Sequence, residues 1–395
     1  MLWILNLFIL IIVVMEFSYG MNSFHKTIKY SPSDFLNHIK DAPTSKMHLA
    51  RLPTPLHKWI PPGLEDLDCI IKRDDMSGSD ASGNKVRKLE FLMSAALDND
   101  TYDSIVTIGG IQSNHCRATA VVARQLGLEP HLILRGDYDE TNKESLLGNL
   151  LWDRLTGSTI YPVTPAVYAV QGQEKLTKRV AEMMKKQGKK PYIIPVGGSC
   201  KLGMWGYLSF VEEVMKQLEL EEKNVDALVF ACGSGGTAAG IAIGFRLYKL
   251  YHNKPVPAIK AVGVCDSPDY FYNHIKEMAE ESCVDFEYMG DVREWISIYS
   301  GQGLGYGRST DEELEYFTSV SSSTGVLLDP VYSLKALYYT SKNWQNMGIN
   351  KGDRVLFLHT GGTYGTADKA ADLLSSLNNQ TPKSVSYDNW RLDNP

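Results

Sequence analysis

Along most of this chain the apolar residues recur with two periodicities, one typical of strands and one typical of helices. Short apolar segments predict strands at Ser104–Ile108, His131–Leu134, Thr159–Val163, Tyr192–Ile194, Ala227–Cys232, Ile259–Val264 and Arg354–His359. Amphipathic segments predict helices, including Val86–Leu97, one that ends at Leu126 before Gly127, Glu144–Leu155 and Lys175–Lys186. This order predicts an α/β fold of open, mostly parallel twisted sheets flanked by helices, with ligands bound at the carboxyl ends of the strands.

The segment Ser82–Lys88 places a lysine directly after a Gly-Asn turn, at the start of a predicted helix. A lysine is most often a solvated surface charge, but a partly buried one can form a Schiff base with an aldehyde. Arg87 and Lys88 follow on the same helix, and such cations would lower the pKa of Lys85 and favour its reactive neutral form. Lys85 is therefore a candidate covalent anchor for an aldehyde cofactor.

A second run, Gly109–His115, places Ser113 and Asn114 between a predicted strand and the helix that follows it. Side chains at such a turn can line a pocket at the edge of a sheet. Together with Lys85, these two residues favour an enzyme that uses pyridoxal phosphate (PLP).

The loop Gly233-Ser234-Gly235-Gly236-Thr237 follows a predicted strand and opens a helix. Its glycines let backbone N–H groups approach an anion, and the helix amino terminus and two hydroxyl groups add favourable partners. It predicts a phosphate site, although not a Walker A loop, because no Gly-Lys-Ser/Thr follows. The loop also fits G-x-G-x-x-A, with Asp266 ending the next strand. An NAD-dependent oxidoreductase is thus a distant alternative, which leaves Lys85 and Ser113 without a role.

Two further loops offer polar side chains. Thr360 directly follows the predicted strand Arg354–His359, where its hydroxyl can face a ring nitrogen. Tyr332 and Ser333 lie just before another helix, where a tyrosine either packs or offers its phenol to a substrate.

Composition narrows the class of protein. The 395-residue chain is long enough for two domains, and its net charge of −6 provides no basic surface for nucleic acid. Its six cysteines form no C-x-x-C pair, so neither a zinc site nor a dithiol motif is expected. Cys232 and Cys265, at the ends of predicted strands, are expected to be buried, reduced thiols.

The amino terminus allows two interpretations. Leu7–Met15 is continuously apolar and Ser18–Gly20 resembles a cleavage site, but no Lys or Arg precedes the apolar run. Residues 1–20 are therefore a signal or anchor, or an upstream extension before a start at Met21. Asn99 and Asn379 match the glycosylation pattern. We expect a cytoplasmic or mitochondrial protein with no stable membrane partner, and the secretory pathway only if residues 1–20 are a signal peptide.

With these motifs, the chain resembles the D-cysteine desulfhydrase and 1-aminocyclopropane-1-carboxylate (ACC) deaminase family, PLP enzymes of the tryptophan-synthase-β type (fold type II). The resemblance runs from about Leu52 to about Asp368 and is carried by Asn-Lys-x-Arg-Lys-Leu-Glu, Gly-Gly-Ile-Gln-Ser-Asn and Asp-Pro-Val-Tyr. It implies a small domain, residues 88–207, and a large domain, residues 21–87 plus 208–395, with PLP in the cleft between them. It also implies a homodimer.

The resemblance implies a role for each candidate residue. Lys85 would carry the Schiff base, while Ser113, Tyr306 and Tyr332 would act on the substrate. Asn114 would hydrogen-bond the ring oxygen of PLP, and Thr360 and Ser333 would lie at its ring nitrogen. The phosphate would bind Lys88 and the glycine-rich loop 233–237.

Two positions separate the activities within this family. ACC deaminases have a glutamate where this chain has Ser333 and a leucine where it has Thr360. A carboxylate holds a proton on the ring nitrogen, whereas hydroxyls leave it largely neutral, which suits β-elimination of a good leaving group such as thiolate. The resemblance therefore implies a lyase that converts a small amino acid, D-cysteine, to pyruvate, ammonia and hydrogen sulfide. ACC deaminase is the near alternative, and Lys85, Ser113 and Tyr332 argue against a non-catalytic ligand-binding relative.

Overall fold

The computed structural model describes residues 26–98, 101–136, 146–221 and 224–379. The amino-terminal segment 1–20 and the candidate glycosylation site at Asn99 lie outside these ranges, and Asn379 is the last residue of a helix. Within them, no helix combines the length and the apolar character needed to cross a bilayer.

The larger of two main sheets has six strands, and its order along the sheet differs from its order along the chain. The strands are, in spatial order, β11 (Ser297–Ser300), β10 (Ala258–Gly263), β9 (Ala227–Cys232), β12 (Arg354–His359), β4 (Asp68–Arg73) and β3 (Leu56–Lys58). All neighbours are parallel except β3, which is antiparallel to β4.

The smaller main sheet has four strands, all parallel to their neighbours. They are β7 (Thr159–Val163), β6 (Glu129–Arg135), β5 (Ser104–Gly110) and β8 (Pro191–Ile193), in spatial order. A separate antiparallel pair joins β1 (Thr27–Lys29) to β2 (Ser45–Met47).

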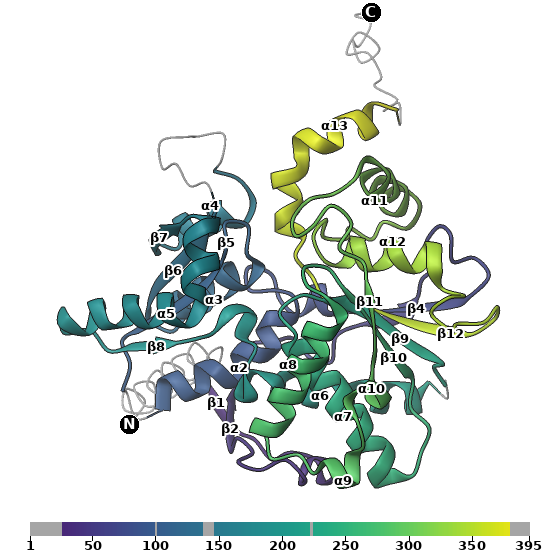
Figure 1. Cartoon of the computed structure of the whole chain (residues 1–395), viewed down its shortest axis with the longest axis horizontal. Coiled ribbons are helices and arrows are strands. Elements are labelled where there is room, and N and C mark those ends of the chain that lie inside the picture. Colours follow the sequence, from purple (N-terminus) through teal and green to yellow (C-terminus); the bar gives the residue numbers. More distant parts are fainter. Residues whose placement is uncertain (1–25, 99–100, 137–145, 222–223, 380–395) are drawn as a thin grey trace, which may run out of the picture.

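Helices cover both main sheets, which form two lobes joined near α2 (Figure 1). The small sheet carries α3 (Asn114–Gln125), α4 (Gly148–Leu155) and α5 (Pro165–Lys186). The helices that follow are α6 (Lys201–Leu220), α7 (Gly236–His252), α8 (Pro268–Glu281), α9 (Phe286–Met289), α10 (Val292–Trp295), α11 (Asp311–Thr324), α12 (Ser333–Asn343) and α13 (Ala370–Asn379). The helix α2 (Asn84–Leu97) contacts both α3 and α6, so it links the two lobes.

Strand β9 shows why the central strands read as unbroken apolar runs. Its side chains alternate between two cores: Leu228 and Phe230 pack with residues of α6 and α7, and Val229 with residues of α11 and α12. A parallel sheet covered by helices on both faces leaves no position for an exposed polar side chain. The predicted α/β class with mostly parallel sheets is confirmed.

In each main sheet, successive strands are added towards one edge up to a point, after which a later strand is added on the other side of the first one. In the large sheet this point lies between β9 and β12, and in the small sheet it lies between β5 and β8. Loops at such points diverge and leave a crevice at the carboxyl ends of the strands. The four loops after β5, β8, β9 and β12 are therefore the ones expected to bind a ligand.

Several predicted bounds differ from the structure. Strands β7, β9 and β12 coincide with their predictions. Helix α5 begins at Pro165 rather than Lys175, because Thr164 caps it and the helix continues past a break at Gly172 (φ +70°). Strands β3, β4 and β11 were not predicted. Part of the predicted helix Glu144–Leu155 lies outside the described residues, and the small sheet lies inside residues 88–207, whose bounds as a domain stay a prediction.

Candidate active site

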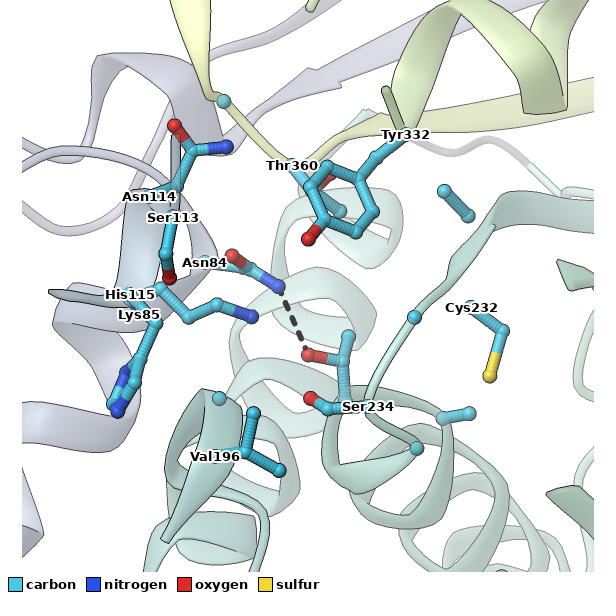
Figure 2. Close-up of a pocket in the computed structure, with 17 residues that line it drawn as sticks. Asn84, Lys85, Ser113, Asn114, His115, Val196, Cys232, Ser234, Tyr332 and Thr360 are labelled. Atoms are coloured by element: carbon cyan, nitrogen blue, oxygen red, sulfur yellow. Dashed lines mark hydrogen bonds between the residues drawn. The ribbon is translucent and has the colours of Figure 1, made fainter. Parts of the chain in front are cut away.

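One pocket lies where the four loops meet at the amino end of α2. Loops of both main sheets contribute to its lining. Predicted site residues that line it are Lys85, Ser113, Asn114, Gly233, Ser234, Gly235, Thr237, Tyr332 and Thr360 (Figure 2). The other four, Lys88, Gly236, Tyr306 and Ser333, contact or adjoin residues of this lining. The fold thus brings the predicted residues together.

The turn before Lys85 is held by hydrogen bonds to its backbone. The N–H of Gly83 donates to Ser77 Oγ at 3.0 Å, and the same hydroxyl donates to Gly83 O at 3.1 Å. Gly83 has φ +87°, and a Cβ there would lie 2.7 Å from Thr360 O, so this turn requires glycine. The N–H of Asn84 also donates to Thr360 O, at 2.9 Å. Lys85 therefore projects from a turn packed against the loop after β12.

The amine of Lys85 points into the pocket (Figure 2) and forms no hydrogen bond or ion pair with any residue that the structure describes. Burial lowers its pKa to about 8, partly opposed by the charge of Asp329. A lysine with this pKa has a much larger neutral fraction near neutral pH than an ordinary lysine, and the neutral amine is the form that attacks an aldehyde.

Arg87 and Lys88 were predicted to lower the pKa of Lys85, but the structure gives them other surroundings. The Arg87 guanidinium lies 2.7 Å from Asp74 and 2.9 Å from Glu213, so two carboxylates already neutralise it. The predicted activation of Lys85 by Arg87 was therefore wrong, and burial takes its place. Lys88 Nζ donates to Gly197 O at 3.1 Å, and burial and the charge of Lys85 lower its own pKa.

The loop between β9 and α7 approaches its neighbours so closely that glycine is needed. Gly235 has φ +86°, and a Cβ there would lie 2.4 Å from His274 Cδ2. A Cβ on Gly233 would lie 2.7 Å from Tyr332 Cε1. The backbone is therefore exposed at the pocket wall, where side chains would otherwise cover it.

Hydroxyl groups surround this same loop. Ser199 Oγ accepts the N–H of Gly236 at 3.1 Å and lies 2.7 Å from Ser234 Oγ. Thr237 Oγ1 accepts from Asn84 Nδ2 at 3.1 Å (Figure 2). The first N–H groups of a helix have no intrahelical acceptor and carry partial positive charge. The amino end of α7 with these hydroxyls has the donor set that a phosphate group requires.

The loop between β5 and α3 contributes Ser113 and Asn114. Ser113 is the N-cap of α3, where its Oγ accepts the N–H of Cys116 at 3.2 Å. This hydroxyl thus has a structural role in addition to lining the pocket. Asn114 Oδ1 accepts a hydrogen bond from Asn149 Nδ2 at 2.8 Å.

Two pairs of hydroxyl groups lie near the loops after β11 and β12. The phenols of Tyr306 and Tyr332 are 2.8 Å apart, and Tyr332 reaches the pocket. Ser333 Oγ is fully buried, 3.3 Å from Thr360 Oγ1 and 3.3 Å from His359 Nδ1. Thr360 therefore reaches the pocket with Ser333 directly behind it.

Sequence reasoning missed the loop after β8. Val196 and Gly197 line the pocket, and Ser199 connects Lys88 to the glycine-rich loop. A Gly-Gly-Ser run two residues after the predicted strand Tyr192–Ile194 was the available signal. His115 also lines the pocket, and burial lowers its pKa well below the ordinary value, so the imidazole is neutral. Among the described residues, no cluster of three potential metal ligands occurs.

Comparison with known proteins identifies the family. The profile of the family described as "Pyridoxal-phosphate dependent enzyme" matches residues 47–361. The chain belongs to this family. PLP is thus the cofactor of this enzyme, and the NAD alternative is excluded.

Relatives of this PLP-dependent enzyme carry both activity names considered above. It is 43% identical over 370 residues, 92% of this chain and 90% of the relative, to an Arabidopsis thaliana protein named "Bifunctional D-cysteine desulfhydrase/1-aminocyclopropane-1-carboxylate deaminase, mitochondrial". It is 34% identical to a "D-cysteine desulfhydrase" of Salmonella newport, with 83% of this chain and 96% of the relative covered. The chain therefore also belongs to the D-cysteine desulfhydrase and ACC deaminase family.

Solved structures agree with this assignment. The crystal structure of an "ACC deaminase homologue" matches with a TM-score of 0.73 and 32% identity, over 88% of this chain and all of that one. A threonine deaminase from Solanum lycopersicum matches with a TM-score of 0.54, over 83% of this chain and 87% of that one. At 16% identity, this second likeness shows the fold alone. The fold is that of type II PLP enzymes, as predicted.

The residues of the pocket fit the cofactor. Lys85 supplies an amine with a lowered pKa, and the amino end of α7 supplies an anion site. Asn114 lines the pocket on the side of the small sheet, and Thr360 on the side of the large sheet. An aldehyde, a phosphate and a polar ring each have a complementary group.

Proposed function

We propose that this enzyme is a β-eliminating lyase that releases hydrogen sulfide from D-cysteine. The observation that carries the proposal is the hydroxyl pair Ser333 and Thr360, 3.3 Å apart at the pocket. The family resemblance implies that this pair would lie at the PLP ring nitrogen. Neither hydroxyl can hold a proton on that nitrogen as a carboxylate does. A ring of this kind is a moderate electron sink, sufficient when the leaving group is a thiolate.

Each residue of the pocket has a proposed task in this reaction. PLP, when bound, accepts the electron pair released at the substrate Cα. Lys85 would hold the aldehyde of the cofactor and, once its amine is free, would receive the Cα proton, with Ser113 beside it. The loop 233–237 and Lys88 would hold the phosphate, and Asn114 would hold the ring oxygen.

Tyr332 is proposed to hydrogen-bond the leaving sulfur. Burial, together with the nearby Tyr306, raises the pKa of Tyr332 well above its ordinary value. The phenol therefore keeps its proton at neutral pH and can donate a hydrogen bond to the departing thiolate. Tyr306, 2.8 Å away, holds the Tyr332 hydroxyl in place.

ACC deaminase is the second candidate, because a relative 43% identical to this chain carries both names. Opening the ACC ring expels no thiolate and so requires a stronger electron sink. Ser333 and Thr360 oppose this activity for the reason given above. We therefore propose weak or absent ACC turnover.

The test is sulfide release from D-cysteine and L-cysteine by the PLP-loaded protein, beside ammonia release from ACC. The double variant Ser333→Glu/Thr360→Leu should gain activity on ACC and lose it on D-cysteine. The control Ser333→Ala/Thr360→Val removes both hydroxyls without adding a carboxylate and should gain nothing on ACC. Efficient ACC turnover by the native protein, with little sulfide from D-cysteine, would contradict the proposal.

We further propose a homodimer with the domain bounds given above. A cytoplasmic or mitochondrial location is favoured, since one relative is named as mitochondrial. Mass measurement of the native protein and sequencing of its mature amino terminus test these proposals.

A further inference from the structure

Asn149, on the first turn of α4, is fully buried and every polar atom of its side chain has a partner. Its Oδ1 accepts from Arg117 Nε at 2.8 Å. Its Nδ2 donates to Asn114 Oδ1 at 2.8 Å and to Gln112 O at 3.0 Å. A rotated amide would oppose donor to donor and acceptor to acceptor, so Asn149 has one orientation.

The orientation of Asn149 determines that of Asn114. Since Asn149 donates to the oxygen of the Asn114 amide, the nitrogen of that amide is the end left to bind a ligand. Figure 2 shows this nitrogen on the pocket side of Asn114. Gly362, in the loop after β12, lies next to this nitrogen. A Cβ at Gly362 would lie 2.5 Å from Asn114 Nδ2, so the absence of a side chain there leaves room for the nitrogen.

Arg117 connects Asn149 to the other lobe. It is fully buried, and its two terminal nitrogens donate to the carbonyl oxygens of Asp80 and Ser82, in the loop just before Lys85. Its guanidinium lies 4.5 Å from the centre of the Tyr364 ring, in the segment after β12. One side chain thus holds the loops that carry Asn114 and Lys85.

Asp153, one turn after Asn149, explains why Arg117 is available for these contacts. Both of its carboxyl oxygens are buried and find no hydrogen-bond partner among the described residues. Burial raises the pKa of Asp153 well above its ordinary value, against the charge of Arg117, which favours the neutral carboxyl. Among the described residues no hydrogen bond joins the two side chains, so Asp153 does not draw the guanidinium away from Asn149.

We propose that Asn149 is a positioning residue that turns Asn114 so that it donates a hydrogen bond to the bound cofactor. Arg117 holds Asn149 in this orientation and ties it to the loop that carries Lys85. The inference rests on the proposed function, because it requires PLP beside Asn114. Asn149 itself does not line the pocket.

The variant Asn149→Asp tests this orientation with little change of shape. The new carboxylate keeps its bond to Arg117 but replaces the donor to Asn114 with an acceptor. Asn114 then turns its nitrogen towards the new carboxylate and presents its oxygen to the pocket. A donor to the PLP ring oxygen favours the deprotonated Lys85 Schiff base, because in that form the oxygen shares no other proton.

The measurement is the pH titration of the visible absorption band of the PLP-loaded protein. Loss of the Asn114 donor should move the midpoint in Asn149→Asp to higher pH by about one unit, the size of one charge-assisted hydrogen bond. Asp153→Asn is the matched control. Asp153 lies on the same helix as Asn149 and close enough to the same guanidinium to feel its charge, and this variant replaces its carboxyl by an amide of the same shape. Its midpoint should equal that of the native protein.

A native midpoint in Asn149→Asp would overturn the proposal, as would an equal shift in Asp153→Asn. If Asn149→Asp does not fold, Asn149→Ala replaces it, since Asn114 then rotates freely. A smaller shift to higher pH is expected there, and no shift would overturn the proposal. A native protein without a visible band after PLP addition would instead contradict the proposed function, so the two failures are distinguishable.

Discussion

Lys85 and Arg87 lie two residues apart on the first turn of α2, yet they enter different environments. Arg87 enters a buried cluster in which Asp74 and Glu213 bind it, and these partners raise its pKa well above the ordinary value against the effect of burial. Lys85 enters the pocket, where the described residues offer it no ion pair, and burial lowers its pKa to about 8. A buried guanidinium with carboxylate partners keeps its charge, whereas a buried amine without them loses its proton more readily and can act as a nucleophile.

The cluster around Arg87 is larger than a single ion pair. Lys72 Nζ and Thr54 also bind within it, and the Tyr207 hydroxyl donates to Asp74 at 2.6 Å. Although burial opposes it, hydrogen bonding and charge from Arg87, together with Lys72, lower the pKa of Glu213 to about 2. This cluster anchors the helix from which Lys85 projects.

The largest effect is expected at Lys85. Lys85→Ala should abolish turnover, a loss beyond the roughly 10²–10⁴-fold typical of a single acid–base group, because the covalent anchor disappears. Borohydride treatment of the native PLP-loaded protein should attach the cofactor to Lys85, as peptide mass mapping can detect. Attachment at another lysine would refute the contrast between the two cations.

Arg87 should affect stability instead. Arg87→Met leaves Asp74 buried without its partner and should cost about 3–5 kcal/mol of unfolding free energy, measured by denaturant titration. Arg293 provides the control, since it also lies 2.7 Å from a carboxylate, that of Asp269, but both side chains are exposed. Arg293→Met should cost at most about 1 kcal/mol. Equal costs for the two variants would show that burial does not distinguish these pairs.

Ser113 is expected to have both a catalytic and a structural role, so it tests the distinction drawn between Lys85 and Arg87. Ser113→Ala should retain PLP and lose roughly 10²–10⁴-fold in turnover, because it removes a proton-transferring group. It should also cost about 1 kcal/mol of stability, because it removes the cap of α3. Thr164 caps α5 with the same 3.2 Å geometry and does not line the pocket, so Thr164→Ala should lose stability alone. Full activity of Ser113→Ala would show that this serine serves only as the cap of α3.

The smallest effect concerns pH. Below pH 8 the Lys85 amine is mostly protonated, and the neutral fraction grows as the pH rises through about 8. The rate of PLP attachment to the cofactor-free protein should therefore rise about tenfold between pH 7 and pH 9 and then level off. Stopped-flow absorbance measures this rate. A rate that keeps rising beyond pH 10 would indicate an ordinary, solvated lysine.

Much of the fold could be predicted because its signals are local. Strands β9 and β12 are buried on both faces, so each is a short apolar run with clear ends. Strand β4 escaped prediction because it contains Lys72, whose charge is satisfied by Glu213, far along the chain. The start of α5 was missed because Gly172 interrupts its pattern.

The candidate site likewise contains residues with a local sequence signal and residues whose role depends on distant partners. The turn Gly83–Lys85 and the loop 233–237 are recognisable because glycine, lysine and hydroxyl side chains stand at strand–helix junctions. The loop Val196–Ser199 has the same signal in a weaker form and was overlooked. Arg87 was misread because its partner Glu213 lies 126 residues away in the sequence.

The sequence alone predicted the α/β class, PLP as the cofactor and the pocket loops after β5, β9 and β12, because periodicity and turn residues act over a few neighbouring positions. The tertiary structure decided which cations find partners and which face the pocket. It also decided that Asn149, 35 residues from Asn114, holds that amide in one orientation. Desolvation and hydrogen-bond geometry depend on what surrounds a side chain in space, and packing between distant segments sets those surroundings.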